Sequence, residues 1–359
     1  MSSNARFLPD LMQTLVFRPD GGAKIGTGHV MRCLALAQAW MDAGGRASFV
    51  MSRGTEMLDA RIGSEKTGIA RFADEPHGAV DARCTVDVAR ELDATWVVVD
   101  GYEFRAEYQD RVRASGLSVM YIDDNGDAPE YVADAVLNQN SYASSALYPR
   151  VQSQTELLLG TRYALLRREF ASWRGHERRI PPVAQRLLIT LGGADLDDAT
   201  SLVVRAAGQA GLGELEVVVL LGAANDREAR VRGAAAGTGL SIRVERDTRH
   251  MARWMAWADM AVTASGTTCW EVCFMGLPTV AIVTAENQQL VSHDLAARGA
   301  LNAGGALEEV NVDSLAASIR SLALDVEGRR AMRAVARTLV DGLGGSRVVS
   351  HLLMSRARA

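Results

Sequence analysis

Gly26-Thr27-Gly28-His29 is the stretch that decides the fold of the first half of the chain. It follows an apolar segment expected to be a strand, residues 15–17, and it precedes a helix expected over residues 30–41. Glycine permits a sharp turn and a close approach to a ligand. Free N–H groups and the positive end of the helix dipole then face whatever lies above the loop. The loop therefore predicts a site for a phosphorylated or sugar ligand beside the His29 imidazole.

The dinucleotide-binding fingerprint is not complete in this loop, because its third glycine would fall where Met31 stands. The loop therefore does not predict an NAD site. A helix N-terminus that carries only a solvated histidine is the alternative interpretation.

The length of 359 residues exceeds one ordinary hydrophobic core and predicts two domains of about 150–180 residues each. The net charge of −4 is spread along the chain without runs, which speaks against nucleic acid as a partner. No apolar run reaches the roughly eighteen residues of a membrane span, so membrane insertion is not expected. Residues 1–14 are expected to be a disordered extension, because they lack the apolar core of a signal peptide.

The four cysteines form no Cys-x-x-Cys motif and no cluster with histidine. This spacing argues against structural zinc and is typical of a reduced, cytoplasmic protein. Neither a metal ion nor another cofactor is expected.

Short apolar segments alternate with helical or turn segments through the whole chain. In the first half the expected strands after the loop are residues 47–51, 95–100, 118–123 and 135–138. Fully apolar runs such as residues 96–99 are typical of strands buried on both faces of a parallel sheet. Several strands end in Asp or Asn, at Asp100, Asp123-Asp124 and Asn138. Ligands bind at such strand ends in doubly wound sheets, although helix capping is the alternative for each residue.

The pattern restarts after residues 172–182, a charged segment ending in two prolines that we expect to be a linker. The strands expected beyond it are residues 186–191, 216–221, 241–245, 260–263 and 279–283, with a helix over 199–210. Two such arrays predict an α/β protein with two Rossmann-like domains, 15–171 and 183–359, facing each other across a cleft. The last helices, 312–324 and 328–340, and the tail finish the second domain or cross back to the first.

The second domain carries a small-residue turn, Ser265-Gly266-Thr267-Thr268, between an expected strand and an expected helix. Such a turn offers N–H and hydroxyl donors to a diphosphate. Glu271, in the first turns of that helix, can accept hydrogen bonds from both hydroxyls of a ribose; a helix-dipole partner is the alternative. Gly192-Gly193 forms a second close-approach loop at the same sheet edge. Asn287-Gln288 supplies amides suited to sugar hydroxyls or N-acetyl groups.

Residues 17–37, from Phe17-Arg18-Pro19 through Gly28-His29 to Ala37, resemble the opening of the pseudaminic-acid-pathway nucleotide-sugar hydrolases. The resemblance covers nearly all of residues 15–345, with matches at Tyr102, Ile122-Asp123-Asp124, Leu137-Asn138-Gln139-Asn140, 160–167, 191–195, Ala264-Ser265, Glu271 and Asn287-Gln288. These enzymes cleave UDP-2,4-diacetamido-2,4,6-trideoxy-β-L-altropyranose into UDP and the free sugar.

More distantly, Trp257-Ala258-Asp259 followed by Ser265-Gly266 and Glu271 is similar to the UDP-binding half of the peptidoglycan N-acetylglucosaminyltransferase. Both families have the GT-B fold, so the resemblance implies that fold here. It also implies that the second domain holds UDP and that the loop histidine of the first domain faces the sugar.

The resemblance to the hydrolases assigns roles by position, with His29 as the catalytic residue. The implied substrate-binding residues are Arg18, Gly28, Tyr102, Asn138, Arg167, Asn287 and Gln288. The implied UDP-binding residues are Gly192, Gly193, Thr248, Ser265, Gly266, Thr267, Thr268 and Glu271. One departure concerns Gly101, because the family usually has His-Tyr after the strand-ending Asp whereas Gly101 precedes Tyr102 here. The missing ring leaves the exact sugar open.

The expected reaction is metal-independent hydrolysis of a UDP-sugar with inversion at the anomeric carbon. His29 would act as general base on water, while helix N-termini stabilise the leaving diphosphate. Two alternatives remain. A GT-B glycosyltransferase that uses a UDP-amino sugar shares the fold, and a non-catalytic UDP-sugar-binding protein is suggested by the missing ring.

Overall fold

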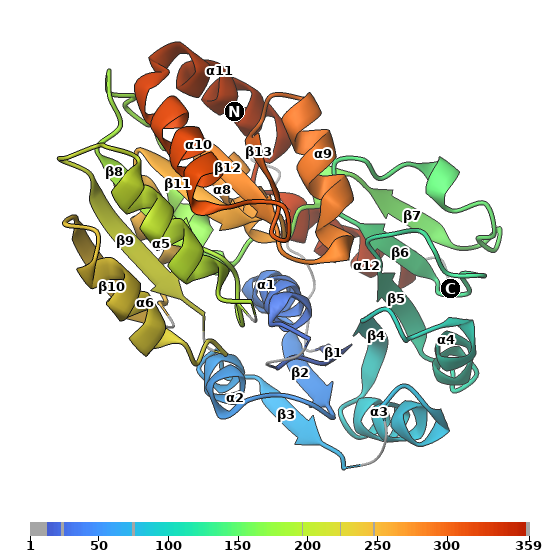
Figure 1. Cartoon of the computed structure of the whole chain (residues 1–359). Helices are drawn as coiled ribbons and strands as arrows, with labels where there is room; N and C mark the ends of the chain where they lie inside the picture. Colours follow the sequence, from blue (N-terminus) through green and yellow to red (C-terminus); the bar gives the residue numbers. More distant parts are fainter. Residues whose placement is uncertain are drawn as a thin grey trace, which may run out of the picture.

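The computed structural model describes residues 13–22, 25–73, 76–195, 197–222, 224–246 and 248–356. In these residues the chain forms two α/β domains, each built on one parallel sheet (Figure 1), as the alternating pattern predicted. The expected extension lies outside the described residues up to position 12, and Thr14 begins the first strand. Among the described residues, no helix combines the length and apolar character needed to cross a membrane.

The first sheet has seven strands in the order β3-β2-β1-β4-β5-β6-β7. Its strands are β1 (Thr14–Pro19), β2 (Arg46–Met51), β3 (Gly68–Arg71), β4 (Ala94–Asp100), β5 (Ser118–Ile122), β6 (Ala135–Asn138) and β7 (Glu156–Leu159). Its helices are α1 (Gly28–Asp42), α2 (Glu56–Gly63), α3 (Ala79–Glu91) and α4 (Ala106–Arg113). Because side chains alternate along a strand, Val98 packs in the core with α1 while Val97 packs in the core with α3 and α4.

The second sheet has six strands in the order β10-β9-β8-β11-β12-β13. Its strands are β8 (Arg186–Thr190), β9 (Glu216–Leu221), β10 (Ser241–Arg246), β11 (Met260–Ala264), β12 (Thr279–Val283) and β13 (Asn302–Ala306). Its helices are α5 (Ala199–Gln209), α6 (Glu228–Ala236), α7 (Met251–Trp257), α8 (Thr268–Met275), α9 (Gln289–Ala297), α10 (Val312–Leu324) and α11 (Val326–Leu339). Helices α5 and α10 share one core with the sheet, and α7, α8 and α9 share the other.

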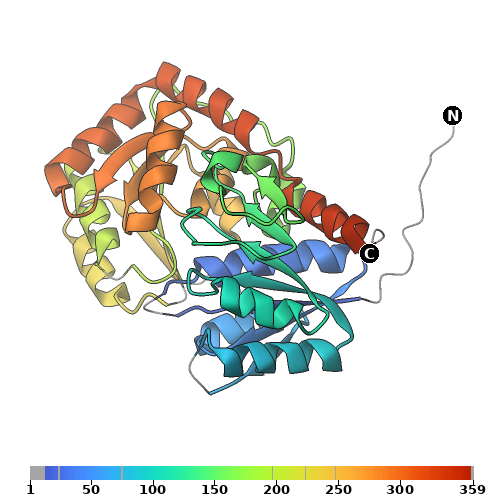
Figure 2. The same ribbon diagram turned by 90° about the vertical axis from the view of Figure 1, so that its right-hand side faces the viewer.

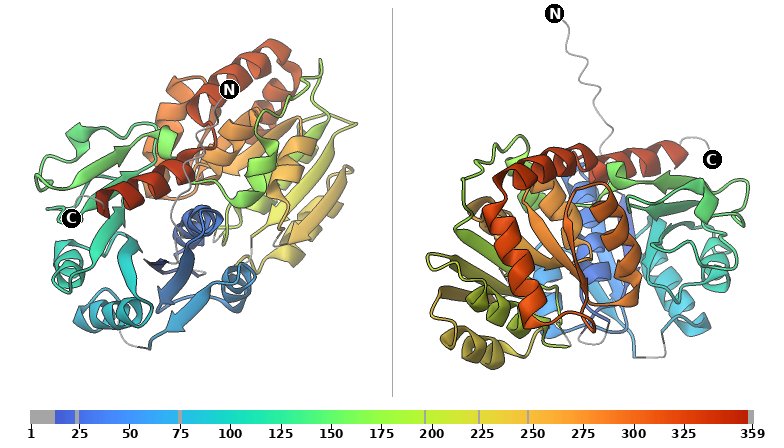
Figure 3. Two further views of the ribbon diagram at one scale, coloured as in Figure 1. Left: turned by 180° about the vertical axis from the view of Figure 1, so that it is seen from behind. Right: turned by 45° about the horizontal axis from the view of Figure 1, so that its top comes forward.

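The chain crosses between the domains twice. The first crossing follows the 3-10 helix η3 (Arg168–Trp173). Within the crossing segment, the guanidinium of buried Arg178 donates to main-chain carbonyls of the second domain. In the second crossing, α12 (Gly344–Arg356) returns to the first domain and packs beside α1 (Figures 2 and 3). Val348 and Leu352 of α12 are buried in the core around α1. The last helix therefore contributes to the core of the first domain.

Helix α1 lies between the two sheets (Figure 1). Its N-terminus follows the carboxyl end of β1, and the N-terminus of α8 follows the carboxyl end of β11. This arrangement brings the loops after the central strands of both domains to one cleft.

Candidate active site

A cleft of about 380 Å³ lies between the two domains. The first domain lines it with residues 25–29 and with side chains from α1, α2 and the ends of β4 and β5. The second domain lines it with loops that follow β8, β11 and β12, at residues 190–195, 266–268, 284–285 and 287–288. Crevices at the carboxyl ends of parallel strands are where ligands bind in open α/β sheets.

Two helix N-termini, one from each domain, line this cleft. Helix α1 begins at Gly28 and α8 at Thr268, and both residues are part of the cleft wall. The residues that precede them, Thr27 and Thr267, make no side-chain capping hydrogen bond. First-turn N–H groups have no partner within their own helix, and the helix dipole adds positive potential. The cleft is therefore suited to an anionic group such as a diphosphate.

The two walls touch in this conformation. A Cβ atom at Gly193 would lie 2.1 Å from Oγ1 of Thr27 and 2.8 Å from its Cβ. Only glycine therefore permits the loop after β8 to approach the start of α1 so closely. The second contact is a hydrogen bond of 2.7 Å that Nδ2 of Asn287 donates to the hydroxyl of Tyr102.

His29 is held by a buried carboxylate at the end of β4. Its Nδ1 lies 2.6 Å from Oδ1 of Asp100, whose side chain is fully buried. Burial raises the pKa of Asp100, but Arg32 and His29 together lower it to about 2. Because an ionised carboxylate only accepts hydrogen bonds, Nδ1 is the donor and Nε2 is left to accept a proton. In the neutral imidazole this tautomer leaves the Nε2 lone pair free, as a general base requires.

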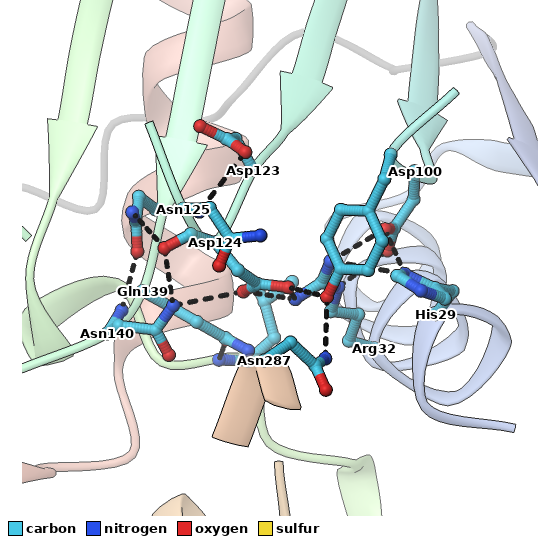
Figure 4. A network of polar contacts seen from close by, with 12 residues as sticks. His29, Arg32, Asp100, Asp123, Asp124, Asn125, Gln139, Asn140 and Asn287 are labelled. Atoms are coloured by element: carbon cyan, nitrogen blue, oxygen red, sulfur yellow. Dashed lines mark hydrogen bonds and ion pairs between the residues drawn. The ribbon is translucent and has the colours of Figure 1, made fainter. Parts of the chain in front are cut away.

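Arg32, one helical turn beyond His29, joins two strand ends (Figure 4). Its guanidinium donates to Asp100 over 2.6 and 2.7 Å and to Asp124 over 2.7 and 2.9 Å. Burial raises the pKa of Asp124, but the Arg32 charge lowers it overall. Both carboxylates are therefore ionised at neutral pH and fix the orientation of the groups around them.

Asp124 also positions Tyr102, whose hydroxyl donates to Oδ2 of Asp124 over 3.1 Å. Burial, followed by the nearby Asp124 charge, raises the pKa of Tyr102, so its hydroxyl keeps its proton. The Tyr102 ring stands edge-on to the His29 ring, with the ring centroids 5.2 Å apart. A continuous polar chain thus runs from Asn287 in the second domain to His29 in the first.

Glu271 of α8 in the second domain is paired with Arg167, which precedes the first crossing between the domains. Nε and one terminal nitrogen of Arg167 donate to Oε1 of Glu271 over 3.0 and 2.8 Å. Burial raises the pKa of Glu271, while Arg167 opposes the rise. Burial lowers the pKa of Arg167, but Glu271 and Glu169 raise it overall, so the geometry is that of an ion pair. Both bonds end on Oε1, which leaves Oε2 without a hydrogen bond from Arg167.

Most residues assigned from the sequence lie together in this cleft. Those that line it are Gly28, His29, Tyr102, Arg167, Gly192, Gly193, Thr248, Gly266, Thr267, Thr268, Glu271, Asn287 and Gln288. Arg18 does not line it, because its fully buried guanidinium is bonded to Asp20 and Asp81. Asn138 is also fully buried and donates to the main-chain oxygen of Asp124. Ser265 is fully buried, and its hydroxyl has no partner in the described part of the chain.

The polar residues behind His29 were not assigned from the sequence, although signals for them exist. Arg32 follows His29 at the spacing that places two side chains on one helix face. Asp100 ends β4 and Asp124 follows β5, and the sheet order sets β4 between β1 and β5. In the described residues, no group of three or more His, Cys, Asp or Glu side chains is arranged to hold a metal ion.

Known proteins resemble both the second domain and the whole chain. Residues 186–338 match the Glycosyltransferase family 28 C-terminal domain. The spore coat polysaccharide biosynthesis protein SpsG of Bacillus subtilis is 24% identical over 343 residues, which span 93% of this chain and 96% of that protein.

Solved structures resemble the chain over nearly its full length. MurG of Acinetobacter baumannii is 15% identical, with a TM-score of 0.63 over 95% of this chain and 99% of that one. UDP-GlcNAc 2-epimerase of Neisseria meningitidis, solved with UDP-GlcNAc bound, is 12% identical, with a TM-score of 0.63 over 96% of this chain and 100% of that one. The chain has the GT-B fold, as the resemblance in its sequence implied.

Proposed function

We propose that the chain is a GT-B enzyme that hydrolyses a UDP-2,4-diacetamido-2,4,6-trideoxy sugar to UDP and the free sugar, in nonulosonate biosynthesis. The matches to a polysaccharide biosynthesis protein and to an epimerase with bound UDP-GlcNAc support an enzyme of nucleotide-sugar chemistry. The pairing of His29 with Asp100 at the edge of a cleft lined by two helix N-termini carries the proposal of hydrolysis.

In this mechanism Nε2 of His29 takes a proton from water as the water oxygen attacks the anomeric carbon. The bond from that carbon to the diphosphate breaks on the opposite face, so the configuration inverts. Asp100 keeps Nδ1 as the donor and stabilises the imidazolium that forms. General-base catalysis of this kind accelerates a reaction by about 10²–10⁴-fold.

UDP is the leaving group and is held by the second domain. The loop of Gly192-Gly193 and the start of α8 at Thr267-Thr268 offer donors to the diphosphate. Oε2 of Glu271 is the acceptor for a ribose hydroxyl, because Arg167 occupies Oε1. The leaving diphosphate is thus held by donors of the second domain, whereas the base comes from the first.

The sugar lies between His29 and the amides of the second domain. Oε1 of Gln288 accepts hydrogen bonds from the main chain and hydroxyl of Thr284 over 3.0 and 3.2 Å, which leaves its Nε2 to donate. Tyr102 and Asn287 supply further polar groups at this end of the cleft. Donors and acceptors in this arrangement suit the carbonyl and N–H groups of acetamido substituents.

Glycosyl transfer is the second candidate, because residues 186–338 match a glycosyltransferase domain. In that reaction His29 would deprotonate an acceptor hydroxyl in place of water. The two reactions are distinguished by turnover without any acceptor.

The test is incubation of the purified chain alone with a panel of UDP-2,4-diacetamido sugars, with mass spectrometry of the products. Hydrolysis predicts UDP and free sugar in equal amounts, with one oxygen from H₂¹⁸O in the sugar. A stable UDP-sugar that reacts only when an acceptor is added would instead assign the chain to the transferases.

A further inference from the structure

Arg61, on α2, is a buried cation at the cleft without a partner. Its side chain lines the cleft, and the residue is only 9% exposed. Among the residues that the structure describes, its guanidinium makes no hydrogen bond or ion pair, and its Nε is buried without an acceptor. Nothing in the hydrolysis mechanism above uses this side chain.

The acidic side chains around Arg61 are already engaged elsewhere. Glu65 accepts from Arg168 over 2.7 Å and from Gln38 over 2.8 Å. Glu169 is paired with Arg167 over 3.0 Å. Burial, together with the nearby Arg167 charge, lowers the pKa of Arg61, although an arginine stays protonated at neutral pH.

An unpaired buried charge is costly, so the free guanidinium favours an anionic partner that enters the cleft. Arg61 also acts on Glu271, whose pKa it helps to hold down, so the two side chains share one end of the cleft. Glu271 comes from the second domain and Arg61 from the first. The guanidinium fork matches the oxygens of phosphate better than any neutral sugar group.

We propose that Arg61 is a nucleotide-binding residue whose guanidinium pairs with phosphate oxygens of the bound UDP. The inference rests on the proposed function, because it takes the ligand to be a UDP-sugar. The first domain then contacts the nucleotide directly, in addition to presenting His29 to the sugar. Binding of the diphosphate would supply the partner that Arg61 lacks.

The experiment measures the dissociation constants of uridine, UMP and UDP for the full chain and its variants by NMR titration. Arg61→Gln should weaken UDP binding about 10- to 100-fold, as expected when a charged hydrogen bond is lost. The same variant should bind uridine as the wild type does. Arg61→Lys keeps the charge and should recover most of the affinity for UDP. The control is Arg249→Gln, an exposed arginine close to Arg61 that does not line the cleft.

Equal weakening of uridine and UDP would place Arg61 against the nucleoside and overturn the proposal. Binding of UDP to Arg61→Gln within twofold of the wild type would overturn it as well. If the wild-type chain binds neither UDP nor UMP, the proposed function itself fails and this inference falls with it. Retained uridine binding, measured on the same sample, shows that the variant is folded.

Discussion

Nδ1 of His29 and Oδ1 of Asp100 lie 2.6 Å apart, although 71 positions separate the two residues in the sequence. The contact exists because β1, which leads into the loop before α1, pairs directly with β4, which ends at Asp100. A parallel sheet brings the carboxyl ends of neighbouring strands to one edge. The proposed catalytic base is thereby oriented by the fold itself.

His29→Asn should lower kcat by about two to four orders of magnitude while folding and UDP affinity stay near the wild type. Asparagine keeps a polar contact but has no nitrogen that can take up the proton. Steady-state kinetics and calorimetry with UDP check both expectations.

The control for His29→Asn is His250→Asn. His250 is exposed at the start of α7 and does not line the cleft. Near-normal turnover in His29→Asn, or an equal loss in both variants, would show that the catalytic assignment is wrong.

Asp100→Asn should change the acid stability of the protein. The folded-state pKa of Asp100 is about 2, below its unfolded value, so its ionised form stabilises the fold above pH ~4. That contribution, about 2 kcal/mol, is lost as the pH falls from ~4 to ~2. Asparagine removes the contribution at every pH and leaves Arg32 with one carboxylate. Urea unfolding midpoints should be lower at neutral pH in the variant and should decline less steeply below pH 4; a decline parallel to that of the wild type would contradict this.

The inner strands were predictable because apolar residues dominate them. The strands expected at 135–138, 216–221 and 279–283 coincide with β6, β9 and β12. The three strands that the pattern did not reveal, β3, β7 and β13, lie at sheet edges. An edge strand is paired on one side only, so it needs less apolar sequence, as the Asn302–Ala306 strand illustrates. The return of α12 to the first domain depends on tertiary packing, so the local sequence could not predict which domain this helix joins.

The loops of the site were predictable because glycine and helix starts mark them in the sequence. Partners across the sheet were harder to predict. Asp100 and Asp124 were recognised as strand ends, but helix capping explained them equally well without the strand order. Arg18 has the appearance of a ligand-binding residue at the end of β1, yet it points to Asp81 of α3. No sequence pattern marks Arg61, because its lack of a hydrogen-bond partner is visible only in the structure.

The hydrogen bond between Tyr102 and Asn287 should couple the two domains during turnover. Tyr102→Phe and Asn287→Ala should each lower kcat/KM by about 3- to 10-fold, the effect expected for a neutral hydrogen bond. The contribution of Asn287 that passes through the Tyr102 hydroxyl is already lost in Tyr102→Phe, so the double variant should be less impaired than the product of the two single effects. Gln289→Ala, which removes an exposed amide outside the cleft, is the control. Additive effects in the double-mutant cycle would show that the two residues act independently.

Gly193→Ala should prevent the two walls of the cleft from meeting. The new Cβ would overlap Oγ1 and Cβ of Thr27, so we expect kcat/KM to fall by more than about tenfold. The matched control is Gly213→Ala, because a Cβ at that exposed position contacts nothing within 4 Å. Adding Thr27→Gly removes the obstructing side chain at a position where glycine is tolerated, and it should restore part of the activity. An active single variant would mean that turnover does not need this closed conformation.

Glu271→Ala should weaken binding of the nucleoside as well as of the nucleotide. If Oε2 of Glu271 accepts a ribose hydroxyl, its loss should raise the dissociation constants of uridine, UMP and UDP by a similar factor, about tenfold. The variant also leaves Arg167 with Glu169 as its remaining partner, so the thermal midpoint should be measured on the same samples. Glu130→Ala, at an exposed glutamate of the first domain, controls for the loss of one negative charge. The pattern is distinct from that of Arg61→Gln, which should spare uridine, so the two variants together separate contacts to the ribose from contacts to the phosphates. Unchanged affinity for all three ligands in Glu271→Ala would remove Glu271 from the nucleotide site.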